Sequence, residues 1–231
     1  MKRIYVSTFT SKISYGRTGA RQAGSNVVII DVLRAVPSAI EVLRQSPSKY
    51  FMTSDEKNIC KVDSDFFRIG KPYMGSNVFY DSPNSPTRIA ESNLSGRNII
   101  HRTAGCGGCL DELDEPKYVL LCTFSNLHST RKMMEEIGGK WDIIASGHQG
   151  KNPAQEDSLC AAALSSDNPE SQLHKLKDAL FGSESLTRFS IDSLEYPKSD
   201  IDICLNEEQV PTVVIAFRHG NNWLIESRNQ I

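Results

Sequence analysis

The chain has 231 residues, of which 39% are hydrophobic and 23% are charged, with 26 basic and 28 acidic side chains and a net charge of −2. This balance argues against an intrinsically disordered chain, and it offers no broad basic field for nucleic acid. The length suits one domain over residues 1–231, built around one core or as two closely packed lobes.

The distribution of apolar residues bears on where the protein works. The longest apolar runs, such as Val27 to Ile30, are far shorter than the roughly 20 residues of a membrane span. The N-terminus lacks the apolar stretch of a secretory signal, and the six cysteines lie mostly in apolar segments, as buried thiols of a reducing compartment do. We therefore expect a cytoplasmic protein with neither membrane nor nucleic-acid partners; a homodimer is compatible with this interpretation.

The first half of the chain contains a strand-loop-helix pattern. Val27 to Ile30 is a continuous β-branched run, typical of a strand covered on both faces, and Asp31 follows at its carboxyl end. The apolar spacing from Pro37 to Arg44 predicts a helix with proline in its first turn. Asn98 to His101 is a further candidate strand, and the Ser/Pro/Asn/Asp-rich segment from Asp81 to Pro86 predicts a loop.

The pattern returns twice in the second half. The apolar run from Tyr118 to Cys122 predicts a strand, followed by a helix near Ser129 to Ile137. Trp141 to Ala145 predicts another strand, followed after a glycine-bearing loop by a helix from Glu156 through Leu164. Alternating strands and helices indicate an α/β protein with a layered α/β/α fold and a mostly parallel sheet.

The C-terminal region adds antiparallel structure. Two late strands, Thr212 to Phe217 and Trp223 to Glu226, flank a Gly-Asn-Asn turn and predict a hairpin, so the sheet should be mixed. The segment from Asp192 to Asp200 is rich in Ser, Pro and Asp and is predicted to be a loop.

Polar and small residues follow each predicted strand of the sheet. Ligands of open α/β sheets bind outside the carboxyl ends of the strands, so these positions are the first candidates for a site. Carboxylates that hold a hard cation, arginines that grip anionic oxygens and glycines that admit backbone N–H groups are what phosphate-ester hydrolysis requires. The residues after the strands include Asp31, Arg34, Arg102, Thr103, Gly105, Cys106, Gly107, Asn126, His148, Glu156 and Asp157.

Each of these signals has a structural alternative. A strand-end Asp can cap a helix, and Glu156-Asp157 can complement the dipole of the helix that it opens. Cys106 and Cys109 form a C-x-x-C pair, a spacing used for redox pairs and for half of a zinc site. No cysteine has the downstream arginine of a cysteine phosphatase, Asp31 lacks the second aspartate of a haloacid-dehalogenase site, and the phosphate-loop fingerprints are missing.

Four segments resemble one known family. Val28-Ile-Ile-Asp-Val-Leu-Arg-Ala35 is similar to the opening motif of the 2-phosphosulfolactate phosphatase family, and Tyr80 to Pro86 is similar to its Asn-Ser-Pro loop. Ser146 to Ala162 resembles its glycine loop leading to Glu-Asp, and Asp200 to Leu205 resembles its C-terminal, Asp-containing strand. The resemblance implies a Mg²⁺-dependent acid phosphatase, which in the founding members acts on 2-phospho-3-sulfolactate during coenzyme M synthesis.

The resemblance and the strand-end positions together suggest roles for individual residues. Asp31, Glu156 and Asp157 are expected to hold Mg²⁺, while Arg34 and Arg102 bind the phosphoryl group of a small phosphorylated anionic substrate. The nucleophile is left open between water and Asp31, with Cys106, Ser85 and Thr103 as weaker candidates. Further substrate contacts are expected from Asn84, Ser85, Thr103, Gly105, Gly107, Asn126 and His148, with His148 also an acid/base candidate.

Two departures from the family pattern keep another function open. The usual Gly-Glu after a strand is Gly70-Lys71 here, and the usual Thr-Thr-Asn-Gly-Thr loop is Arg102-Thr-Ala-Gly-Cys106. If the missing glutamate is a metal ligand, the chain binds phosphorylated ligands without hydrolysing them. A thiol redox protein that uses Cys106 and Cys109 is a third, weaker hypothesis.

Overall fold

The computed structural model describes residues 8–169, 180 and 184–229. These residues form a mixed α/β fold with a central nine-stranded sheet of order β1-β7-β2-β6-β8-β9-β3-β5-β4. The strands are β1 (Phe9–Tyr15), β2 (Asn26–Ile30), β3 (Lys49–Thr53), β4 (Phe67–Ile69), β5 (Asn98–Arg102), β6 (Tyr118–Cys122), β7 (Gly139–Ala145), β8 (Thr212–His219) and β9 (Asn222–Asn229).

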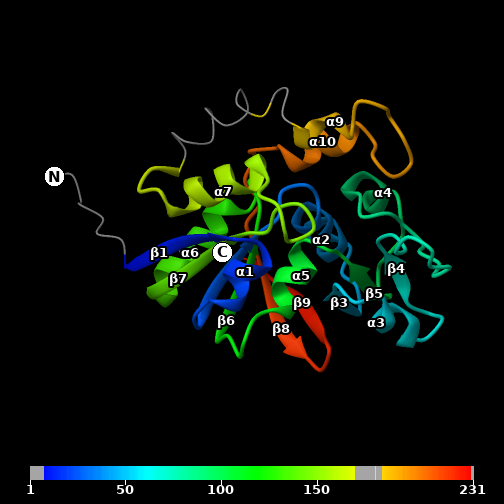
Figure 1. Ribbon diagram of the computed structural model, residues 1–231, viewed down its shortest axis with the longest axis horizontal. Helices are drawn as coiled ribbons and strands as arrows, with labels where there is room; N and C mark the ends of the chain where they lie inside the picture. Colours follow the sequence, from blue (N-terminus) through cyan, green and yellow to red (C-terminus); the bar gives the residue numbers. More distant parts are fainter. Residues whose placement is uncertain (1–7, 170–179, 181–183, 230–231) are drawn as a thin grey trace.

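The helices occupy both faces of the sheet, as the layered α/β/α prediction requires (Figure 1). They are α1 (Gly16–Arg21), α2 (Ala35–Arg44), α3 (Glu56–Lys61), α4 (Pro86–Ala90), α5 (Cys106–Asp111), α6 (Leu127–Ile137), α7 (Gln155–Ser165), α9 (Glu184–Thr187) and α10 (Ser199–Cys204). Helices α1, α2 and α5 contact one face, and α6 and α7 contact the other. In the described part of the chain, no helix is long and apolar enough to cross a membrane.

Alternation along β2 shows how the two layers are built. Val27 and Ile29 belong to the core beneath α2 and α5, whereas Val28 and Ile30 belong to the core beneath α6 and α7. All of these side chains are fully buried. Successive side chains of a strand point to opposite faces, so a continuous apolar run is what a strand with two covered faces needs.

The predicted hairpin joins two sets of parallel strands. The β8–β9 hairpin pairs antiparallel with β6 on one side and with β3 on the other. The set β1, β7, β2 and β6 therefore runs opposite to the set β3, β5 and β4. Figure 1 shows the hairpin in red between these two sets.

The twist of the sheet brings the two sets of strand ends together. Twist accumulates at roughly 20–25° for each neighbouring strand, so β2 and β5 are rotated relative to each other by on the order of 100°. Consistent with this, the backbone N–H of Cys106, just after β5, donates a 3.1 Å hydrogen bond to Asp31 Oδ2, just after β2. The carboxyl ends of both sets thus border one region of the molecule.

The predicted elements are largely confirmed, with differences near the site. The strands around Val28, Ile100, Leu120 and Ile143 form as predicted, and so do the hairpin and the helices that follow β2, β6 and β7. The predicted Asp192–Asp200 loop is wrong at its end, because α10 begins at Ser199. The family-like strand from Asp200 is also wrong, because this segment is helical.

Candidate active site

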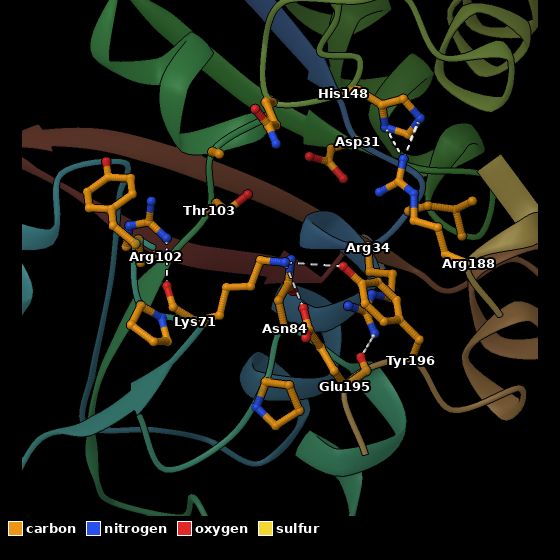
Figure 2. A pocket seen from close by; sticks show the side chains of 18 of the residues that line it. Asp31, Arg34, Lys71, Asn84, Arg102, Thr103, His148, Arg188, Glu195 and Tyr196 are labelled. Carbon is orange, nitrogen blue, oxygen red and sulfur yellow. Dashed lines mark hydrogen bonds and ion pairs between the residues drawn. The ribbon is translucent and has the colours of Figure 1, made fainter. Parts of the chain in front are cut away.

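A cavity of about 380 Å³ lies between the strand ends of the two sets. Figure 2 shows side chains from both sets and from the segment after α9 pointing toward it. Seven of the predicted site residues line the cavity: Asp31, Arg34, Asn84, Arg102, Thr103, Gly105 and His148. The structure therefore brings together predicted site residues from four separate stretches of the sequence.

Asp31 lies at the end of β2, where its carboxylate joins three segments. Its Oδ1 accepts the backbone N–H of Ala35 at 2.9 Å, and its Oδ2 accepts the backbone N–H of Cys106 at 3.1 Å. Burial is the largest cause that raises the pKa of Asp31, and the negative charge of Glu156 adds to it. Asp31 thus accepts backbone N–H groups at the starts of α2 and α5. It also lines the cavity, where a ligand can reach it.

Asp157, near the start of α7, lies directly behind Asp31. Ser146 Oγ is 3.2 Å from Asp31 Oδ2 and 3.1 Å from Asp157 Oδ2, so the two carboxylates share one hydroxyl. Asp157 also accepts the backbone N–H groups of Val32 and Gly147, each at 2.8 Å. Burial raises the pKa of Asp157 well above the ordinary range, and the charges of Asp31 and Glu156 raise it further.

Glu156, next to Asp157 at the start of α7, is the third acid of this group. It is buried, and within the described residues its Oε2 has no hydrogen-bond partner. Neither Glu156 nor Asp157 lines the cavity, and the described residues contain no cluster of three Asp, Glu, His or Cys side chains arranged to ligate a metal. Mg²⁺ usually takes one or two carboxylates and keeps several waters, so an ion at the cavity wall would be held by Asp31 and water and not by a complete protein cage.

The two predicted arginines are each held by a carbonyl and an aromatic ring. Arg102 Nη1 donates to the carbonyl of Lys71 at 2.7 Å, and its Cζ lies 3.7 Å from the Tyr73 ring centroid. Arg34 Nη1 donates to the carbonyl of Glu195 at 2.5 Å, and its Cζ lies 4.5 Å from the Tyr196 ring centroid. Such contacts fix the direction of a guanidinium group.

The cavity wall carries more positive than negative charge. The cavity is lined by two carboxylates, those of Asp31 and Glu195, and by four basic side chains, those of Arg34, Lys71, Arg102 and Arg188. Lys71 Nζ lies 2.8 Å from Glu195 Oε1, and among the described residues neither Arg102 nor Arg188 forms an ion pair with a carboxylate. Arg188 instead contacts the ring of His148. An excess of fixed donors of this kind favours an anionic ligand.

Several predicted substrate contacts lie behind the cavity wall. The side chain of Asn126 is fully buried, where it accepts the N–H of Thr123 at 2.8 Å and donates to the carbonyl of Leu121 at 3.0 Å. Ser85 caps α4 and is also fully buried. A Cβ at Gly107 would lie 2.7 Å from the carbonyl oxygen of Thr53, so this glycine allows close packing of α5 on β3.

The C-x-x-C pair is buried in α5 and does not line the cavity. Cys106 and Cys109 are both inaccessible to solvent and free of disulfides. Burial raises the pKa of Cys106 well above its usual range and raises that of Cys109 to about 12. Reactive cysteines are thiolates with depressed pKa values, so this environment disfavours both the redox hypothesis and Cys106 as a nucleophile.

Sequence reasoning missed most of one wall of the cavity. Its residues Arg188, Phe189, Glu195 and Tyr196 come from the segment between α9 and α10. The composition of this segment predicts a loop from Asp192 to Asp200 and no functional role. Lys71 was noticed as a departure from a family pattern, but its partner Glu195 lies 124 positions away. No local periodicity or spacing signals such a contact.

Fold and site together define a layered α/β protein with an anion-receptive cavity beside buried carboxylates at the strand ends. The model of the family described as 2-phosphosulpholactate phosphatase matches residues 16–218 of this chain. The chain belongs to that family, as the motifs around Asp31 and Glu156 indicated. No curated protein matches the chain.

Proposed function

We propose that this protein is a Mg²⁺-dependent phosphatase that hydrolyses the phosphate monoester of a small anionic hydroxy acid similar to 2-phosphosulfolactate. The observation that carries the proposal is the meeting of Asp31 and Asp157 at Ser146 Oγ, beside a cavity walled by Arg34 and Arg102. Membership of the family supports the reaction class. Coenzyme M synthesis is the pathway context that this substrate suggests.

Asp31 and Asp157 would hold the metal ion, directly or through water, and Glu156 would contribute its charge from behind. Among the described residues Glu156 Oε2 has no hydrogen-bond partner, and burial with mutual repulsion raises the pKa values of Asp31 and Asp157, so a cation placed beside these acids would be stabilised by them. When bound, Mg²⁺ would neutralise the charge that develops on the phosphoryl oxygens.

The arginines would bind and orient the phosphoryl group. Arg34 and Arg102 are already fixed by carbonyls and by tyrosine rings, so little reorganisation is needed when charge builds up on the ester. Thr103, Asn84 and the backbone at Gly105 would complete the wall. His148, which lines the cavity next to Arg188, would protonate the leaving group. Asp31 remains the candidate nucleophile from the protein, with water as the alternative.

The test is hydrolysis of a generic aryl phosphate with and without Mg²⁺, followed by a screen of phosphorylated hydroxy acids. Glu156→Gln is the sharpest variant, because no described hydrogen bond to its carboxylate would be lost, and it should abolish Mg²⁺-dependent turnover. Asp31→Asn should do the same, with circular dichroism to check that the fold survives. Glu135→Gln, at a surface pair with Arg131, is the control, and full activity in both site variants would contradict the proposal.

A second candidate function is a phospho-ligand binder that lacks turnover, and the charge at Lys71 favours it. Lys71 stands at the cavity wall in an ion pair with Glu195, where the family pattern has a carboxylate. Calorimetric binding of phosphate esters without hydrolysis, whichever divalent cation is supplied, would favour this candidate.

A further inference from the structure

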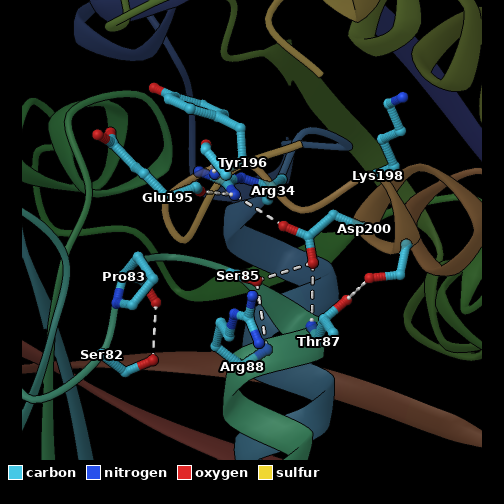
Figure 3. A network of polar contacts seen from close by, with 12 residues as sticks. Arg34, Ser82, Pro83, Ser85, Thr87, Arg88, Glu195, Tyr196, Lys198 and Asp200 are labelled. Carbon is cyan, nitrogen blue, oxygen red and sulfur yellow. Dashed lines mark hydrogen bonds and ion pairs between the residues drawn. The ribbon is translucent and has the colours of Figure 1, made fainter. Parts of the chain in front are cut away.

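Asp200, in the short helix α10, makes a buried ion pair with the cavity arginine Arg34. Asp200 Oδ2 lies 2.7 Å from Arg34 Nη1, and the two side chains are 0% and 7% exposed. Figure 3 shows the carboxylate between the arginine and the start of α4. Asp200 does not line the cavity, so it reaches a ligand only through Arg34.

The other carboxylate oxygen of Asp200 is held by α4. Asp200 Oδ1 accepts Ser85 Oγ–H at 2.8 Å and the backbone N–H of Thr87 at 3.0 Å (Figure 3). The carboxylate is therefore fixed by two donors on one oxygen and by the guanidinium on the other. This arrangement also explains why Ser85 is fully buried and does not contact the cavity.

The network leaves part of the guanidinium available. Within the described chain, the hydrogen bonds of Arg34 are made through Nη1, to Asp200 and to the carbonyl of Glu195. Nη2 and Nε keep their donors for a ligand, and the Tyr196 ring limits the motion of the group. An anionic oxygen in the cavity could thus meet donors whose direction is already set.

Stability alone gives little reason for this ion pair. Desolvation of two buried charges offsets much of their attraction, and apolar pairs of similar volume are often at least as stable. A buried pair does, however, prevent a long flexible side chain from sampling other rotamers.

We infer that Asp200 is a positioning residue, which sets the orientation of Arg34 for anion binding and couples it to the packing of α4 and α10. The inference rests on the proposed function, because it assumes that Arg34 binds the phosphoryl group. Asparagine cannot replace Asp200 in this role. It offers one acceptor oxygen, so its NH₂ group would face either Arg34 or the Thr87 N–H, both of which are donors.

The test is calorimetric binding of inorganic phosphate, in the presence of Mg²⁺, to the full-length wild type, Arg34→Gln, Asp200→Asn and the double variant. Each single change should weaken binding roughly 10- to 100-fold, the range of a charged hydrogen bond. The double variant should bind no more weakly than the weaker single variant, because both changes remove one interaction. Asp202→Asn, an exposed position of the same helix, is the matched control and should bind as the wild type does.

Wild-type affinity in Asp200→Asn, or losses that multiply in the double variant, would overturn the inference. If Asp200→Asn does not fold, Ser85→Ala takes its place, since it removes one donor to Asp200 and leaves Arg34 intact. It should weaken phosphate binding several-fold and broaden the side-chain ¹⁵N resonances of Arg34; unchanged affinity with unchanged resonances would also overturn the inference. A wild type that binds phosphate but hydrolyses no ester would contradict the proposed function and leave this comparison valid.

Discussion

Asp31 and Asp157, 126 positions apart in the sequence, place one carboxylate oxygen each within 3.2 Å of the same hydroxyl, Ser146 Oγ. Backbone N–H groups from the loop after β2, from α5 and from Gly147 hold both carboxylates in place. Two buried acids at this separation repel each other unless a proton or a cation lies with them. The predictions below begin with this repulsion.

Glu156→Gln should stabilise the metal-free protein at neutral pH. Asp31 and Asp157 have raised pKa values in the native state, so the native state binds more protons than the unfolded state does. Stability is therefore lost as the pH rises from the ordinary carboxyl pKa through the raised values. Removing the nearby Glu156 charge should raise the free energy of unfolding by on the order of 1–3 kcal/mol. Urea unfolding measures this, and Glu135→Gln should show no such gain.

Binding of Mg²⁺ should strengthen as the pH rises above the ordinary carboxyl pKa and through the raised values of Asp31 and Asp157. Protons compete with the cation for Asp31 and Asp157, whose pKa values are raised by burial first and by neighbouring charge second. The shift of the unfolding midpoint on adding Mg²⁺ should thus grow with pH and should vanish in Glu156→Gln. A midpoint that responds equally to Mg²⁺ at all pH values would contradict the assignment of the site.

Only one cysteine should react quickly with a thiol reagent in the native protein. Cys60 is exposed, whereas Cys106, Cys109, Cys122, Cys160 and Cys204 are buried and free. Burial raises the pKa of Cys109 to about 12, so neither member of the C-x-x-C pair supplies a thiolate at neutral pH. Titration with an aromatic disulfide should find one fast thiol before unfolding and six after it; fast reaction of Cys106 and Cys109 would revive the redox hypothesis.

His101 should make the protein sensitive to acid. It is fully buried, its Nδ1 lies 2.8 Å from Tyr50 Oη, and burial lowers its pKa to about 3, with a further contribution from the charge of Arg34. The unfolded state, with a His pKa near 6.5, binds the proton more readily, so stability falls as the pH drops below that value. The loss should be about 1.4 kcal/mol per pH unit. His101→Gln should lack this loss, which urea unfolding of the wild type and the variant at a series of pH values would measure. If the two proteins showed the same pH dependence of stability, His101 would not be its cause.

Gly107→Ala should destabilise the fold by roughly 1–3 kcal/mol, as overpacking of a rigid contact does. Its Cβ would meet backbone atoms of Thr53 and Ser54, at 2.7 and 3.1 Å at the nearest, and backbone cannot swing aside. Gly24→Ala is the control, because its Cβ would meet only the side chain of Asp142 at 3.3 Å. Thermal unfolding of both variants compares them, and an equal small effect would show that Gly107 does not serve packing.

The sequence by itself determined the layered α/β class and most of the strands in the set β1, β7, β2 and β6. The β-branched runs of β2 and β6 need cover on both faces, and the strand-end position of Asp31 follows from that periodicity. The Gly-Asn turn between β8 and β9 predicted the hairpin from local chemistry alone. Patterns of this kind are local, so they are legible without coordinates.

Only the tertiary structure decided which of the candidate residues face the cavity. Asn126, Ser85 and Cys106 carry suitable chemistry at suitable positions, yet each is turned inward, because the backbone around it needs a cap or a close contact. Lys71 and Glu195 meet because two segments far apart in the sequence line the same cavity. The opposed strand sets meet at their carboxyl ends through the twist of the sheet and the placement of the hairpin, which are properties of the whole sheet and of no single segment.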